Sequence, residues 1–163
     1  MLSSIVDSDP PDVEERFSAF YRAERIGAAR LAWLLARDSS SCDDVVQDAF
    51  TSVYVRFATL DSPKAYLRMA IVNRVKEVGR SAGRERRRIQ LVSAGRPLVT
   101  DGPTGGLADA IARLPLPQRA AIVLRYYVDL PIEEIAAALD VRPGSVRSML
   151  SRATATLKKE LPR

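Results

Sequence analysis

The chain has 163 residues and a formal net charge of +5, with 25 Lys and Arg against 20 Asp and Glu. Its length suits one domain or two small ones, and its apolar content of 47% is enough to build a core. Cys42 is the only cysteine and there is no histidine, which excludes an intrachain disulfide, a Cys/His zinc site and the usual general base of neutral-pH enzymes.

The N-terminal segment Met1–Pro10 lacks the basic and apolar regions of a signal peptide, and no apolar run in the chain reaches membrane-spanning length. A cytoplasmic protein without membrane insertion is therefore expected. From Asp12 to about Arg37 the apolar residues recur at helical spacing, which predicts one long helix or a helix broken at Gly27.

A second helix is predicted from Ser41 to about Phe57, because Ser41 and Asp44 have the spacing of a capping box. One face of this helix is apolar, and Asp44, Gln47 and Asp48 lie together on another. Asp44 and Asp48 repel each other at the i, i+4 step, so a basic surface is expected to meet them.

A metal site or carboxylate-only catalysis on Asp43, Asp44 and Asp48 stays open. It is disfavoured because no Gly-rich phosphate loop, second acidic cluster or nucleophile elbow accompanies these residues. No catalytic residue, metal or cofactor is expected.

A third helix is predicted to begin at Pro63, since proline is favoured in the first turn of a helix. Its polar residues step by three or four and form one mostly cationic ridge that suits a phosphate backbone. The ridge consists of Asn73, Lys76, Arg80, Arg84 and Arg87. Gly79 and Gly83 weaken the expectation of a continuous helix. Between Ile89 and Gly106 the periodicity disappears and Gly and Pro accumulate, which predicts a flexible linker.

The C-terminal third has the pattern of a helix-turn-helix. A short helix over 131–139 is expected to end at Asp140 in a left-handed conformation, and Pro143-Gly144 cannot continue it. An upstream helix over 118–128 would supply a third apolar stripe. In the last helix the apolar stripe leaves polar and cationic residues pointing outward, which is typical of a helix that enters the DNA major groove. These outward residues are Ser145, Arg147, Ser148, Ser151 and Arg152.

The alternative is a helical hairpin with a solvated basic face. The short turn, the third apolar stripe and the mixture of Ser with Arg favour DNA binding over that alternative.

The two halves together resemble bacterial sigma factors of the extracytoplasmic function group, which keep regions 2 and 4. The resemblance covers about residues 14–161 and rests on three motifs in order. They are Asp43-Asp-Val-Val-Gln-Asp-Ala-Phe50; Ala65-Tyr-Leu-Arg-Met-Ala-Ile-Val-Asn73; and Leu114 through Arg125 followed by Glu133-Glu-Ile-Ala136 and Gly144-Ser-Val-Arg-Ser148. In the last helix, directly after this motif, Met149 stands where relatives usually have Arg.

The resemblance implies an all-α chain of two small helical domains joined by a linker: region 2 at 11–88, the linker at 89–106 and region 4, a helix-turn-helix, at 107–163. It implies that Asp44, Gln47 and Asp48 bind the clamp coiled coil of the largest subunit of core RNA polymerase, and that the flap is a further contact. Promoter DNA would be bound at the −10 element by Asn73, Lys76, Arg80 and Arg84, with the loop Ala58–Lys64 admitting a flipped base. At the −35 element it would be bound by Arg147, Ser148, Ser151 and Arg152. An anti-sigma factor is a partner of many such proteins.

Two alternatives remain at this point. A stand-alone helix-turn-helix regulator would need neither an acidic polymerase-binding face nor promoter melting. A carboxylate-dependent enzyme would be expected to show a shift of melting temperature with divalent metal.

Overall fold

The computed structural model describes residues 12–37, 39–92 and 106–161, and within these ranges every regular element is a helix. The N-terminal half, as we call it, contains α1 (Val13–Ala36), α2 (Ser39–Arg56), the short turn η1 (Phe57–Thr59) and α3 (Pro63–Val92). The C-terminal half contains α4 (Leu107–Arg113), α5 (Leu116–Ile122), the turn η2 (Val123–Tyr127), α6 (Ile132–Leu139) and α7 (Pro143–Glu160). The predicted all-α fold class is confirmed.

Helix α1 is continuous through Gly27. The carboxylate of Asp12 accepts a hydrogen bond from the Val13 amide at 2.7 Å, and Arg37 ends the helix with φ 59°. The capping-box prediction was wrong by two residues, since α2 begins at Ser39 and Ser41 lies inside it. The apolar stripe of α2 is buried as expected, with Val45 and Val53 at the centre of the packing against α1 and α3.

Helix α3 begins at Pro63, where the Ser62 hydroxyl accepts a hydrogen bond from the Ala65 amide at 3.3 Å. It passes Gly79 without a break and ends at Val92, so it includes the first four residues of the expected linker. Residues 93–105 of that linker lie outside the described residues, as do the first 11 residues, on which the signal-peptide prediction rested. Of Arg87 only the backbone is described.

The helix predicted over 118–128 is divided in the structure. Helix α5 stops at Ile122 and continues as the wider turn η2, in which the Val128 amide donates to the Val123 carbonyl at 3.1 Å. This i to i+5 bond is the mark of a π-turn. The widened turn is followed by Asp129 with φ 60°, which redirects the chain into α6.

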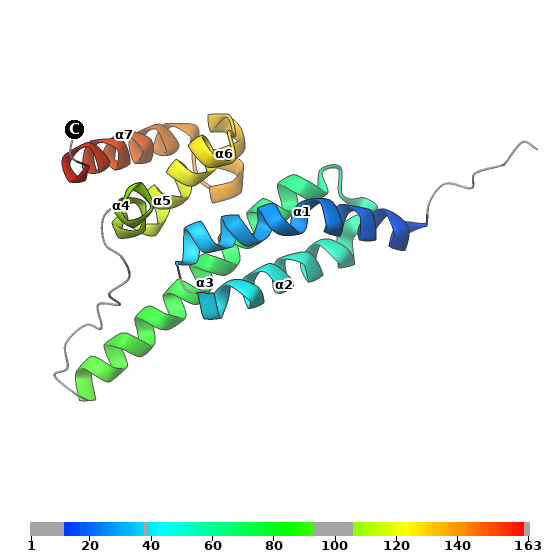
Figure 1. Cartoon of the computed structure of the whole chain (residues 1–163), viewed down its shortest axis with the longest axis horizontal. Coiled ribbons are helices and arrows are strands. Elements are labelled where there is room, and N and C mark those ends of the chain that lie inside the picture. The colour runs from blue at the N-terminus through cyan, green and yellow to red at the C-terminus, as the bar shows by residue number, and fades with distance from the viewer. Residues whose placement is uncertain (1–11, 38, 93–105, 162–163) are drawn as a thin grey trace, which may run out of the picture.

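The two halves are packed against each other (Figure 1). Helix α6 lies on α3, while α4, α5 and η2 contact α1. One cluster of buried residues includes Leu35 and Ile71 from the N-terminal half and Leu124, Ile135 and Val146 from the C-terminal half. Among the described residues, no helix combines the length and apolarity needed to cross a membrane.

Candidate nucleic-acid and protein interfaces

The turn between α6 and α7 is fixed by backbone hydrogen bonds and by one left-handed residue. Asp140 has φ 54° and ψ 52°, as the sequence predicted. The Val141 amide donates to the Ala136 carbonyl at 3.0 Å, and the Asp140 amide donates to the Ala137 carbonyl at 3.3 Å. This pair of bonds is a Schellman motif, which satisfies the last carbonyls of α6 and turns the chain sharply. The helix-turn-helix is therefore present.

Helix α7 presents the expected face to solvent. Val146 and Ala153 are fully buried and Leu157 is 8% exposed, so these residues hold the opposite face against the core. Met149 is half-buried and packs against the buried cluster that contains Val146. The side chains predicted to read DNA, namely Arg147, Ser148, Ser151 and Arg152, are all exposed.

These outward side chains are not engaged by strong contacts elsewhere in the protein. The Arg147 guanidinium lies 3.8 Å from the Glu133 carboxylate, and both groups are mostly exposed, which makes this a weak ion pair. The Ser148 hydroxyl donates to the Gly144 carbonyl at 3.1 Å. Arg142, which the sequence analysis did not select, is exposed beside the first turn of α7. Its position directly before Pro143 was the sequence signal that could have identified Arg142 as a residue of this surface.

The cationic ridge of α3 is only partly open. Asn73, Arg80 and Arg84 are exposed, and Arg84 donates to the Ser81 hydroxyl at 3.3 Å. Lys76 differs, because its ammonium donates to the Leu139 carbonyl of α6 at 3.0 Å. Burial lowers the pKa of Lys76; the nearby charge of Arg80 acts in the same direction, and Asp140 opposes it.

The loop Ala58–Lys64 lies beside a cavity of about 530 Å³ that is shared between the halves. Leu60, Asp61 and Ser62 of the loop and Tyr66 of α3 line one side, and Glu134 of α6 belongs to the other. The C-terminal half thus lies beside the loop predicted to admit a flipped base, and Asp61 and Ser62 of that loop stay exposed.

Asp44, Gln47 and Asp48 are exposed together on α2, but Asp48 already has a basic neighbour. Its carboxylate lies 2.7 Å from Nε of Arg74, whose Nη1 also donates to Glu77 at 2.8 Å. The hydrogen bond with Glu77, and then the charge of Asp48, raise the pKa of Arg74. Asp44 is therefore better placed than Asp48 to contact a partner. No cluster of three or more metal-ligating side chains occurs within the described ranges.

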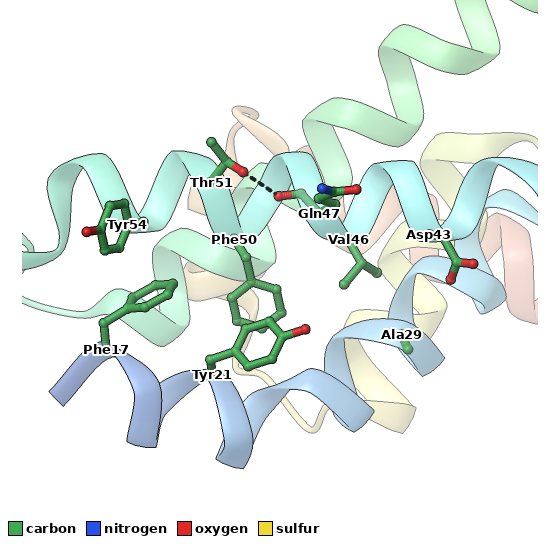
Figure 2. A pocket seen from close by; sticks show the side chains of 9 residues that line it. All are labelled: Phe17, Tyr21, Ala29, Asp43, Val46, Gln47, Phe50, Thr51 and Tyr54. Atoms are coloured by element: carbon green, nitrogen blue, oxygen red, sulfur yellow. Dashed lines mark hydrogen bonds between the residues drawn. The ribbon is translucent and has the colours of Figure 1, made fainter. Parts of the chain in front are cut away.

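An apolar groove of about 540 Å³ runs beside this acidic face, between α1 and α2 (Figure 2). Its walls are aromatic: Phe17 and Tyr54 meet edge to face with ring centroids 4.9 Å apart, and Tyr21 and Phe50 do so at 4.7 Å. Gln47 lines the groove and joins it to the acidic face. The exposure of Tyr21 (43%) and Tyr54 (49%) depends on how two helices pack, which periodicity in the sequence does not reveal.

Comparison with known proteins gives consistent matches. Residues 105–157 match the family described as Sigma-70, region 4. The chain is 31% identical over 151 residues to an RNA polymerase sigma-E factor of Streptomyces coelicolor, covering 89% of this chain and 85% of that protein. It is 29% identical to the corresponding protein of Streptomyces avermitilis, covering 89% and 84%.

Solved structures share the fold. The sigma factor RpoE from Bartonella quintana, solved in complex with the anti-sigma factor NepR, gives a TM-score of 0.73 with 22% identity, over 89% of this chain and 96% of that one. CnrH, solved with the cytosolic domain of CnrY, gives 0.64 with 23% identity, over 90% and 87%. Together with the helix-turn-helix and the order of motifs, these matches show that the chain belongs to the RNA polymerase sigma factors of the extracytoplasmic function group.

Proposed function

We propose that the two halves of this sigma factor divide the recognition of a promoter, with region 2 at residues 11–88 and region 4 at residues 107–163. One observation carries the proposal. Helix α7 exposes a set of polar and cationic side chains, whereas α2 exposes an acidic face. A cationic helix face and an acidic helix face suit two partners of opposite charge, namely DNA and a basic protein surface.

In the C-terminal half, α7 enters the major groove of the −35 element. Short hydroxyl side chains let the helix approach the bases closely, while Arg147 reaches guanine or phosphate. Ser148, Ser151 and Arg152 complete this surface, and Arg142 is positioned to meet a phosphate beside the groove.

In the N-terminal half, the ridge of α3 meets the −10 element. Three exposed side chains can contact the DNA directly: Asn73, Arg80 and Arg84. Lys76 can contact it once its hydrogen bond to the Leu139 carbonyl is broken. The loop Ala58–Lys64 receives a base flipped out of the opened strand. This chain performs no covalent chemistry but positions DNA for the polymerase. It therefore acts in the same compartment as the polymerase.

The acidic face of α2 docks on core RNA polymerase at the clamp coiled coil. Asp44 and Gln47 supply polar contacts, and the adjoining aromatic groove is suited to an apolar side chain of the same partner. The flap of the polymerase is the proposed contact for the C-terminal half. An anti-sigma factor is a further proposed partner, in keeping with the complexes in which the two structural neighbours were solved.

Core binding is tested by charge reversal on α2. We expect Asp44→Arg to weaken binding to core RNA polymerase by at least tenfold, because it places a cation against a basic surface. The matched control is Glu15→Arg, an equal change of charge at an exposed site on α1. Binding is measured by fluorescence anisotropy of labelled chain, with circular dichroism to show that both variants fold. Equal affinity for the parent chain and Asp44→Arg would remove this face from the polymerase interface.

A further inference from the structure

One arginine lies between the acidic face of α2 and the cationic ridge of α3. The Nε atom of Arg74, in α3, is 2.7 Å from the Asp48 carboxylate of α2. Nη1 of the same side chain donates to the Glu77 carboxylate at 2.8 Å. A single guanidinium is therefore shared by two carboxylates, one of which belongs to the acidic face that we propose docks on the polymerase.

The second carboxylate, Glu77, interrupts the cationic ridge of α3. Asn73 lies four residues before Glu77 and Arg80 lies three residues after it, so the three side chains share one face of the helix. All three are exposed. An unneutralised carboxylate at this position repels the phosphates that the ridge is proposed to meet. Arg74 is the cation that neutralises it.

The two contacts of Arg74 differ in kind. The contact with Glu77 is a hydrogen bond, whereas the Nε–H bond is not directed at the nearby Asp48 oxygen. The pKa of Arg74 is raised first by the hydrogen bond with Glu77 and next by the charge of Asp48. The Asp48 side chain is 51% exposed, and ion pairs at such exposed sites are weak. Asp48 is therefore the partner that Arg74 gives up more readily.

A hollow of about 240 Å³ adjoins these groups. Asp48 and Ser52 of α2 line it together with Asn73, Arg74 and Glu77 of α3. The Arg74 side chain can therefore move from Asp48 towards Glu77 without disturbing the buried packing between the two helices.

We propose that Arg74 is a positioning residue that links polymerase binding to DNA binding through its charge. A basic group of core RNA polymerase that pairs with Asp48 leaves Arg74 to Glu77 alone. The neutralised Glu77 then no longer opposes the approach of DNA phosphates to the ridge. Before docking, Arg74 competes with the polymerase for Asp48. This inference rests on the proposed function, because it uses the polymerase and −10 surfaces assigned there.

Binding to core RNA polymerase tests whether the two carboxylates share Arg74. We expect Arg74→Met to bind core about two- to fivefold more tightly, because Asp48 loses its competing cation. Glu77→Gln should bind about two- to threefold more weakly, since Arg74 then stays with Asp48. The effect of Glu77→Gln should disappear in a chain that also carries Arg74→Met.

Fluorescence anisotropy of the labelled full chain measures these affinities, and circular dichroism shows whether each variant folds. The matched control is Arg25→Met, which removes the same charge from an exposed site on α1 and should leave the affinity for core unchanged.

Promoter binding by the holoenzyme, which is core polymerase with the chain bound, tests the second surface. The probe is a labelled promoter duplex that the parent holoenzyme enriches from a randomised library. Holoenzyme with Arg74→Met should bind this duplex about fivefold more weakly, although the same chain binds core more tightly. Adding Glu77→Gln to that chain should restore the parent affinity, because the ridge then carries no unpaired carboxylate. A purely structural role of Arg74 would weaken both kinds of binding and would not be rescued by Glu77→Gln.

Weaker core binding by a folded Arg74→Met chain would overturn the proposal, as would a Glu77→Gln effect that persists without Arg74. Promoter binding that is unaffected by Arg74→Met, or not restored by Glu77→Gln, would also overturn it. If Arg74→Met does not fold, the exposed substitution Glu77→Gln decides alone, since undiminished core binding by that variant contradicts the sharing of Arg74. A parent chain that neither binds core polymerase nor enriches a promoter would instead overturn the proposed function.

Discussion

Arg147 and Arg152 both project from the exposed face of α7, but they stand at different distances from the start of the helix. Arg147 lies in the second turn, next to Glu133 of α6, whereas Arg152 lies near the middle. In helix-turn-helix proteins the N-terminal residues of the recognition helix contact base edges. Arg147 is therefore expected to read sequence, and Arg152 to combine base and phosphate contacts.

Removal of each arginine should separate these roles. We expect Arg147→Ala to cost about 1–3 kcal/mol of binding free energy and to relax preference at one base pair. Arg152→Ala should weaken binding to all sequences more evenly and reduce its dependence on salt concentration. The measurement is binding of the full chain with core polymerase to duplexes that vary at the −35 element. Unchanged sequence preference and affinity in both variants would mean that α7 does not read DNA.

At the scale of elements, the sequence predicted the type of almost every helix because each has a clear apolar period. It also predicted the left-handed Asp140, since Asp followed by Val-Arg-Pro-Gly leaves the chain few alternatives. It failed at boundaries: Ser41 resembled a cap because the Ser-x-x-acid spacing also occurs inside helices, and α2 begins at Ser39. The π-turn η2 has no period of its own, so it was taken for part of a regular helix.

The turn between α6 and α7 is an element whose stability can be tested. Glycine adopts a positive φ without strain, so Asp140→Gly should stay within about 1 kcal/mol of the parent in free energy of unfolding. Asp140→Val should lose about 1–2 kcal/mol, because a β-branched residue is strained in the left-handed region. Asp140→Asn serves as the control for charge, since it keeps the tolerance for this conformation. The measurement is urea denaturation; equal stability of the Gly and Val variants would contradict the importance of the Schellman turn.

At the scale of the whole molecule, the contacts between the halves could not be predicted from the sequence. Arg119 and Leu35 are 84 residues apart, and Lys76 and Leu139 are 63 apart. Neither periodicity nor local spacing carries information over such separations. The same limit explains why the sequence placed Lys76 on an open ridge and Asp48 on an unpaired acidic face. In the structure, Lys76 has the Leu139 carbonyl as a neighbour, and Asp48 has the Arg74 guanidinium.

The family establishes the general function of this chain, and the packing of the two halves is what this structure adds. As a sigma factor, the chain binds core RNA polymerase and directs it to promoters. In the structure, the two surfaces that we propose bind DNA belong to one packed body.

The most direct test of the account is transcription from a randomised promoter library. Core RNA polymerase with the parent chain transcribes barcoded templates that vary across the −35 and −10 elements, and the transcripts are sequenced. We predict enrichment of two separate motifs at a fixed spacing, with Arg147→Ala altering only the upstream motif and Arg80→Ala weakening only the downstream one. Transcripts no more abundant than with core polymerase alone, or enrichment of a single motif, would contradict the assignment of the two halves to the two promoter elements.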